Sequence, residues 1–130
     1  MLNLKILKDK KVLYVEDDKS IMKSFTPILH KIFDTVLTAT NGEDGLELFK
    51  KNQDVDFVIT DIKMPRMDGL DMSGEIKKLS PDTPCILTTA HGEYDYFLRA
   101  DEIGIYRYIQ KPLDIQNLLE ILAEFIENKS

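Results

Sequence analysis

Hydrophobic and polar residues alternate along this chain with two different periods, which separate short strands from longer amphipathic helices. Five short runs rich in β-branched and other apolar residues predict strands. These runs are Val12–Glu16, Thr35–Thr40, Asp56–Thr60, Cys85–Thr89 and "YRYIQ" at residues 106–110. Several of them are apolar almost without interruption, which is typical of strands that are buried on both faces in a parallel sheet.

Longer segments with apolar residues at helical spacing follow each predicted strand. Asn or Asp is expected to cap three of these helices, because its side chain accepts hydrogen bonds from the first free backbone N–H groups. The capping residues are Asn41, Asp68 (or a start at Gly69) and Asp114. In the helix of residues 20–33, Pro27 should bend the helix or remove one hydrogen bond. Another helix is predicted over Glu93–Ile103, and Gly104 is expected to end it.

The order of these elements, a strand followed by a helix five times over in 130 residues, predicts a single α/β domain. We expect a five-stranded parallel sheet with five helices distributed over both of its faces, a doubly wound fold. In open sheets of this kind, ligands bind outside the carboxyl ends of the strands. The residues at those strand ends are therefore the candidates for chemistry.

Charged and hydroxyl-bearing residues stand at the carboxyl ends of four of the five predicted strands. They are Glu16-Asp17-Asp18 at the first, Asp61 at the third, Thr88-Thr89-Ala90 at the fourth and Gln110-Lys111-Pro112 at the fifth. Clustered carboxylates repel one another, and a nearby cation relieves the repulsion. Mg²⁺ is the expected cation, because proteins hold it with one or two carboxylates while waters and phosphate oxygens complete its shell.

The same residues suit a phosphoryl group. Lys111 supplies a positive charge, and the Thr89 hydroxyl and the Ala90 N–H supply neutral donors for phosphoryl oxygens. Asp61 is expected nearest the centre and is the candidate nucleophile, since aspartyl phosphate is a known kind of covalent intermediate. Taken singly, each of these residues is more often a helix cap or a turn residue. Their joint occurrence at strand ends favours a phosphoryl-transfer site.

Four blocks of sequence carry a family resemblance: "VLYVEDD", "VITDIKMPRMDGL", "ILTTA" and "YIQKP". In this order they resemble the receiver domain of two-component response regulators over about residues 11–127. The resemblance implies a flavodoxin-like sheet with strand order 2-1-3-4-5. It implies that a sensor histidine kinase transfers a phosphoryl group to Asp61 in a Mg²⁺-dependent reaction. It implies no further enzymatic activity beyond self-phosphorylation from a donor and autodephosphorylation.

The resemblance also assigns roles to individual residues. The metal ligands are Glu16, Asp17, Asp61 and the backbone carbonyl of Lys63; the phosphoryl group is held by Thr89, Ala90 and Lys111; the switch residues are Thr89 and Tyr108. Phosphorylation is expected to change the face formed by the fourth helix, the fifth strand and the fifth helix, which would serve a homodimer or an effector. Glu16 departs from the family pattern, in which this position is more often Asp, and could bind the metal through water or more weakly.

Three other phosphate-binding classes fit the residues less well. A flavodoxin shares the fold, but Glu16-Asp17-Asp18 would repel the flavin phosphate after the first strand. A haloacid-dehalogenase-type phosphatase needs a second Asp two residues after its nucleophile, where this chain has Lys63. The motif G-x-x-x-x-G-K-[ST] of nucleotide-hydrolysing proteins is not found in the sequence. A degenerate receiver that only binds a partner is the remaining alternative.

The composition of the chain indicates which classes of partner and which cellular compartment to expect. Acidic residues outnumber basic ones by 23 to 17, which disfavours nonspecific binding of nucleic acid. Cys85 is the single cysteine, so no internal disulfide forms. The sequence contains no signal-peptide pattern and no apolar stretch of about 20 residues, so we expect a cytoplasmic protein that does not enter a membrane.

Two further expectations concern the C-terminal third of the chain. Aromatic residues are concentrated between residues 94 and 108, namely Tyr94, Tyr96, Phe97, Tyr106 and Tyr108. They either pack between a helix and the sheet or form an interface, since aromatic side chains are enriched at interface cores. The Lys111–Pro112 bond is expected to be cis, because Lys111 must point into the site while the chain turns sharply.

Overall fold

The computed structural model describes residues 5–90 and 96–129 of the chain, and within these residues it contains six helices and five strands. The elements are α1 (Lys5–Lys8), β1 (Lys11–Val15), α2 (Lys19–Ile32), β2 (Thr35–Ala39), α3 (Gly42–Lys51), β3 (Phe57–Asp61), α4 (Gly69–Leu79), β4 (Cys85–Thr89), α5 (Phe97–Ile103), β5 (Arg107–Gln110) and α6 (Ile115–Lys129). No helix among the described residues is sufficiently long and apolar to cross a membrane.

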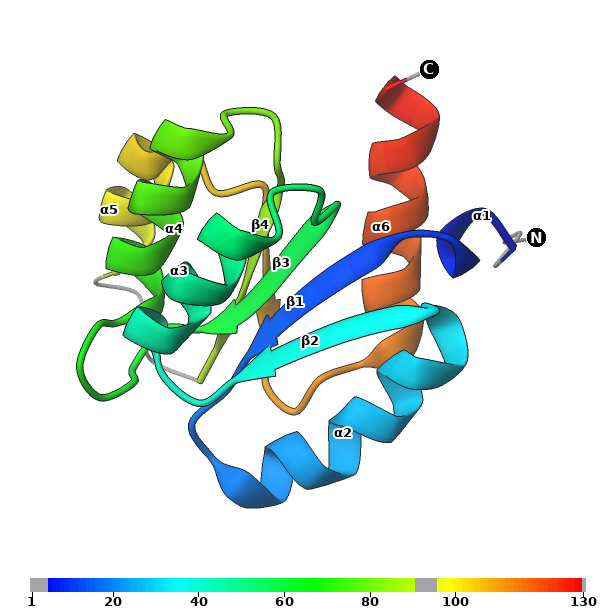
Figure 1. Cartoon of the computed structure of the whole chain (residues 1–130), viewed down its shortest axis with the longest axis horizontal. Coiled ribbons are helices and arrows are strands. Elements are labelled where there is room, and N and C mark those ends of the chain that lie inside the picture. Colours follow the sequence, from blue (N-terminus) through cyan, green and yellow to red (C-terminus); the bar gives the residue numbers. More distant parts are fainter. Residues whose placement is uncertain (1–4, 91–95, 130) are drawn as a thin grey trace.

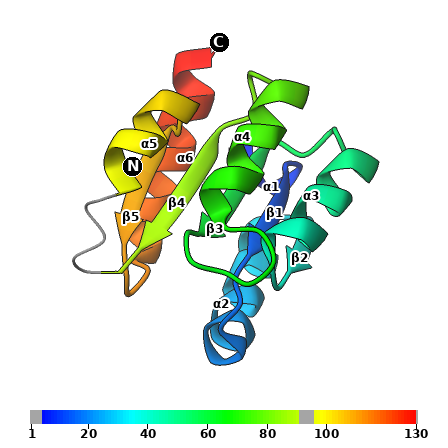
Figure 2. The same ribbon diagram turned by 90° about the vertical axis from the view of Figure 1, so that its left-hand side faces the viewer.

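All five strands run parallel in the order β2-β1-β3-β4-β5, which confirms the predicted sheet (Figures 1 and 2). Because the strands are parallel, their carboxyl ends lie at one edge of the sheet. The register brings Asp61 opposite Thr88, and Thr89 opposite Gln110. Residues predicted to act together therefore come from neighbouring strands.

Helices cover both faces of the sheet (Figures 1 and 2). The face covered by α2 and α6 holds one hydrophobic cluster, in which Phe57 contacts Phe33 and Phe125 with ring centroids 6.3 and 5.7 Å apart. The clusters on the other face are covered by α3, α4 and α5. Truncating one such buried aromatic residue to Ala typically costs about 3–5 kcal/mol, so these two layers hold the strands, and with them the strand ends, in a rigid frame.

Local sequence signals explain where most of the helices begin and end. The side chains of Asn41 and Asp68 accept hydrogen bonds from Asp44 and Asp71 N–H, and Asp114 accepts from Gln116 N–H, so the three predicted caps are confirmed. Gly104 ends α5 with φ +90°, a left-handed conformation that glycine adopts without steric cost. The predicted start of α5 at Glu93 lies outside the described residues.

The helices differ from the prediction in two respects. There are six of them among the described residues, not five, because a four-residue helix, α1, precedes β1. Four residues are too few to show a helical period, but Leu7 is fully buried and Lys8 O accepts the Asp34 N–H at 2.9 Å. Pro27 lies inside α2, which continues to Ile32 although proline offers no N–H for the helical hydrogen bond.

Candidate functional site

The carboxyl ends of β1 and β3 bring three carboxylates together. Val15 pairs with Thr60 in the sheet, so Glu16 and Asp61 follow in adjacent strands. One carboxylate oxygen from each of Glu16, Asp17 and Asp61 lies within 4.8 Å of the other two. The predicted metal-binding carboxylates therefore meet at one place, although they come from two separate segments of the chain.

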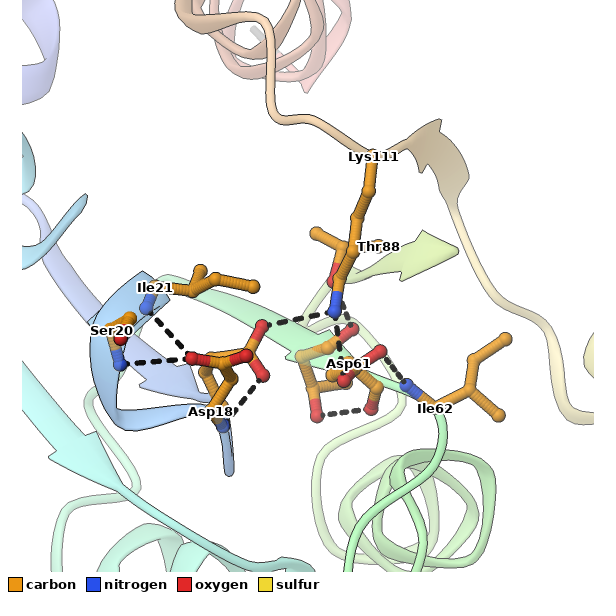
Figure 3. A network of polar contacts seen from close by, with 9 residues as sticks. Asp18, Ser20, Ile21, Asp61, Ile62, Thr88 and Lys111 are labelled. Carbon is orange, nitrogen blue, oxygen red and sulfur yellow. Dashed lines mark hydrogen bonds and ion pairs between the residues drawn. The ribbon is translucent and has the colours of Figure 1, made fainter. Parts of the chain in front are cut away.

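Asp61 is the last residue of β3 and is only 7% exposed. Its Oδ1 accepts the Ile62 N–H at 2.8 Å, and its Oδ2 lies 2.9 Å from the Lys111 ammonium (Figure 3). Two donors, the next residue in the chain and a lysine from the loop after β5, thus hold both carboxylate oxygens. A carboxylate held this way is oriented before any ligand arrives, which favours its use as a nucleophile.

The loop behind Asp61 turns sharply into α4, as the run "MPRMDG" suggests. Gly69 N–H donates to Ile62 O at 2.7 Å, and a Cβ at Gly69 would lie 1.9 Å from Asp61 O. Only glycine permits this close approach of two backbone segments. Within the loop, Arg66 adopts φ +72° and its guanidinium lies 3.1 and 3.2 Å from the two carboxylate oxygens of Glu43. The loop is thus tied to α3, a contact that the sequence did not reveal.

Glu16 is completely buried at the end of β1. Its Oε2 accepts the Asp18 N–H at 3.1 Å, and its Oε1 lies 3.3 Å from the Lys111 ammonium. Burial and then the nearby Asp61 carboxylate raise the pKa of Glu16 to about 7, although the Asp18 N–H and Lys111 act in the opposite direction. The longer side chain thus places a weakly acidic carboxyl group beside Asp61.

Lys111 reaches the site from the loop between β5 and α6 (Figure 3). Its backbone N–H donates to Thr89 O at 2.7 Å, and the bond to Pro112 is cis, as predicted. Burial alone would lower the pKa of Lys111, but its hydrogen bond to Asp61 and the charges of Asp61 and Glu16 raise it. The ammonium therefore stays charged between two carboxylates and partly neutralises them.

The remaining acidic and basic candidates lie at the rim. Asp18 caps α2, accepting the N–H groups of Ser20 and Ile21 at 2.9 and 3.1 Å, as Figure 3 shows. Asp17 is exposed, so its carboxylate is accessible from solvent for metal binding. The Lys63 side chain is also exposed, with its ammonium 5.9 Å from the centre of the Tyr96 ring.

The end of β4 supplies hydroxyl groups. Thr89 is 4% exposed and Ala90, which follows the strand, is exposed at the rim. Thr88, to which the sequence assigned no role, pairs with Asp61 in the sheet, and its hydroxyl donates a long hydrogen bond of 3.5 Å to Thr60 O (Figure 3). The strand therefore presents two adjacent buried threonines where the resemblance pointed to one.

Tyr108 lies in β5 and packs against α5. Its hydroxyl donates to Asp101 Oδ1 at 2.7 Å, and its ring centre is 4.9 Å from that of Phe97. Burial, followed by the hydrogen bond to Asp101, raises the pKa of Tyr108 to about 12. Tyr108 pairs with Leu87, two residues before Thr89, so it lies on the same face of the sheet as Thr89.

The described tyrosines between residues 96 and 108 pack against the hydrophobic clusters of the domain. Tyr96 and Tyr108 contact the cluster beside α5, and Tyr106 makes an edge-on contact with Phe125 at 5.2 Å. The predicted member Tyr94 lies outside the described residues. Leu98, at 74% exposed, is the prominent apolar residue on the surface of α5, and the sequence did not single it out. The packing alternative is thus supported for the three tyrosines of this region that the structure describes.

The donor set fits Mg²⁺ by its chemistry. Three carboxylates and one ammonium leave an excess of negative charge, and all the ligand atoms are oxygens, which hard divalent cations prefer. Glu16 Oε1 is buried yet receives no hydrogen bond of acceptable geometry from the described residues, despite its ion pair with Lys111. A cation at the rim would compensate the negative charge of these carboxylates.

Comparison with known proteins places this arrangement in a family. The profile of the response regulator receiver domain matches residues 12–123. The chain is 32% identical over 119 residues to the transcriptional regulatory protein GlrR of Escherichia coli K12, covering 92% of this chain but 27% of that protein. It is 28% identical over 122 residues to sporulation initiation phosphotransferase F of Bacillus subtilis, covering 94% and 98% of the two chains.

Solved structures agree with the sequence comparison. The crystal structure of a response regulator receiver domain protein from Clostridium thermocellum superposes with a TM-score of 0.85 at 34% identity, covering 92% of this chain and 96% of that one. The chain is thus similar to response regulator receiver domains in both sequence and fold. The chain belongs to the response regulator receiver domains of two-component signal transduction.

Proposed function

We propose that Asp61 accepts a phosphoryl group from the phosphohistidine of a sensor kinase in a Mg²⁺-dependent reaction. The observation that carries the proposal is the position of Asp61, 2.9 Å from Lys111 and within 4.8 Å of two further carboxylates. A carboxylate oxygen of Asp61 attacks phosphorus, the phosphorus–nitrogen bond breaks, and the donor histidine leaves with the electron pair of that bond. Hydrolysis of the aspartyl phosphate by water later returns the free carboxylate.

The residues around Asp61 have different roles in this transfer. Asp17, Asp61 and the Lys63 carbonyl would hold Mg²⁺, and Glu16 would bind it directly or through a water molecule. The bound ion would supply positive charge to the phosphoryl oxygens. Lys111 already contacts Asp61 and supplies a second positive charge. The hydroxyl of Thr89 and the N–H of Ala90 are the neutral donors to the phosphoryl group. Such donors stabilise the charge that develops during transfer.

Intact-mass analysis after incubation with acetyl phosphate and Mg²⁺ tests the acceptor. We expect one labile phosphoryl adduct on the wild type and none on Asp61→Asn. Asp56→Asn is the matched control, because Asp56 lies just before the amino end of β3, away from the site, and accepts the Lys11 N–H. An adduct that persists at full yield in Asp61→Asn would reject the assignment. No adduct on the wild type would favour a degenerate receiver that only binds a partner.

Calorimetric titration tests the metal site separately. Mg²⁺ should bind weakly, and Asp17→Ala should weaken it strongly, because Asp17 is the exposed carboxylate of the cluster. Asp82→Ala serves as the control, since Asp82 is exposed in the loop before β4, at the amino end of the sheet. Unchanged binding in Asp17→Ala would show that this cluster is not the metal site.

A donor kinase has to reach the rim around Lys111. A mostly apolar depression of about 260 Å³ adjoins the rim, and it is lined by Ser20, Ile21, Ser24, Phe25, Lys111, Pro112 and Leu113. It lies between the start of α2 and the loop before α6, and it includes Lys111, which contacts Asp61. This depression supports docking of a protein donor there.

Thr89 and Tyr108 are the proposed relay to the face formed by α5, β5 and α6. The phosphoryl group adds acceptor oxygens that the Thr89 hydroxyl can meet, and Tyr108 lies on the same sheet face. Tyr108 would exchange its contact with Asp101 for space beneath α5, altering the face that binds a second copy or an effector. Comparison of structures with and without a phosphoryl mimic tests this relay. An unmoved Thr89 and an identical Tyr108 rotamer would eliminate it.

A further inference from the structure

The hydroxyl of Tyr14 is a buried polar group that the proposed reaction does not use. Tyr14 lies within β1, its side chain is completely buried, and its ring makes a tilted contact with Phe25 at 5.6 Å. Its oxygen has no hydrogen-bond partner among the described residues. Buried hydroxyl groups are nearly always paired in native proteins, so this one requires a partner.

The carboxylates at the rim act on the Tyr14 hydroxyl. Burial and then the carboxylates of Glu16, Asp61 and Asp18, in that order, raise the pKa of Tyr14. These three residues stand at the carboxyl ends of β1 and β3. Tyr14 is the penultimate residue of β1 and precedes Glu16 by two residues, so its buried side chain lies on the Glu16 face of the sheet near this rim.

Glu16 offers the complementary group. Residues two apart in a strand lie on the same face, so the side chains of Tyr14 and Glu16 leave β1 in the same direction. Glu16 Oε1 is also buried and receives no hydrogen bond of acceptable geometry from the described residues, although Lys111 lies 3.3 Å away. A phenol donates and a carboxylate oxygen accepts. One buried donor in β1 and one buried acceptor just after its end thus lie on the same face of the sheet, and neither has a hydrogen bond among the described residues.

We propose that Tyr14 is a positioning residue whose O–H is linked to Glu16 Oε1 through one buried water, since the two atoms are not hydrogen-bonded directly. The contact holds the Glu16 carboxylate toward the metal-binding cluster; this consequence rests on the proposed function, whereas the contact itself does not. Glu has one more rotatable bond than Asp, so a carboxylate at this position gains more from a fixed partner. Groups that orient a metal ligand in this way commonly change metal affinity by about 10–100-fold when removed.

Magnesium titration of Tyr14→Phe is the first test, because the substitution keeps the ring against Phe25 and removes only the hydroxyl. We expect Tyr14→Phe to weaken Mg²⁺ binding about tenfold, while Tyr106→Phe, a matched change at a tyrosine far from the cluster, leaves it unchanged. In a Glu16→Met background, where no acceptor remains, the same Tyr14→Phe change should have no effect. Unchanged binding in Tyr14→Phe, or an equal loss in both backgrounds, would overturn the proposal.

Nuclear magnetic resonance of protein labelled at the tyrosine Cζ carbons is the second test, and it needs no metal. In metal-free buffer, Glu16→Met should shift the Tyr14 signal, because the phenol loses its acceptor, while the Tyr106 signal stays in place. An unmoved Tyr14 signal would overturn the contact. If Glu16→Met shifts the Tyr14 signal but the wild-type protein binds no Mg²⁺, the contact is kept and the proposed metal site is rejected.

Discussion

Replacing Lys111 with Met should destabilise the domain in a way that depends on pH. The ammonium of Lys111 lies 2.9 Å from Asp61 Oδ2 and 3.3 Å from Glu16 Oε1, and both carboxylates are buried. Methionine keeps most of the apolar stem and removes the charge. Breaking a buried ion pair by removing one partner typically costs about 3–5 kcal/mol, because the other charge is left uncompensated.

Protonation of Glu16 limits that cost at low pH. Its pKa rises from 4.5 to about 7 on folding, so the folded state binds this proton more tightly than the unfolded state. The corresponding stability is present below pH 4.5 and is lost as pH rises through 7. Without Lys111 the pKa of Glu16 rises further, and each pH unit over which only the folded state holds the proton is worth about 1.4 kcal/mol. The destabilisation by Lys111→Met should therefore be about 1 kcal/mol larger at pH 8 than at pH 6.

Urea unfolding in metal-free buffer at both pH values measures this effect. The matched control is Lys78→Met, which removes an exposed ammonium 3.4 Å from Glu75 and should cost less than about 1 kcal/mol at either pH. Mg²⁺ should restore part of the stability of Lys111→Met, because it supplies positive charge to the same carboxylates. Equal unfolding free energies for Lys111→Met and Lys78→Met at pH 8 would refute the electrostatic reasoning.

Three further substitutions test other features of the site. Gly69→Ala should destabilise the domain by about 2 kcal/mol or more and reduce phosphorylation from acetyl phosphate, because its Cβ would lie 1.9 Å from Asp61 O; wild-type values in both assays would contradict this. Glu16→Gln should flatten the decline in unfolding free energy between pH 5 and 8, and an unchanged slope would assign the decline to other groups. Asp114→Ala should lower the unfolding free energy by about 1 kcal/mol, the usual cost of a lost N-cap, whereas the labile adduct on Asp61 should form as in the wild type.

Local features of the sequence determined the elements and the positions of the chemical groups. The caps Asn41, Asp68 and Asp114 were predictable because a capping side chain bonds to backbone N–H groups two or three residues away. The alternation of strands and helices predicted a parallel sheet, whose geometry places every strand end at one edge. Asp61 and Lys111 could therefore be assigned to one site before any distance was known. The strand order itself was implied by the family resemblance and is confirmed by the structure.

Only the tertiary structure decided which groups touch. Lys111 contacts both Glu16 and Asp61, Tyr108 donates to Asp101, and the helix α1 packs on the core although its sequence has no helical period. The burial of Glu16 is likewise a feature of the folded molecule, as is the Tyr14 hydroxyl without a partner among the described residues. Each depends on side chains that are distant in sequence and on how far water is excluded between them. The strength of these interactions, and whether each raises or lowers a pKa, depends on distance and desolvation. No local pattern of residues specifies either quantity.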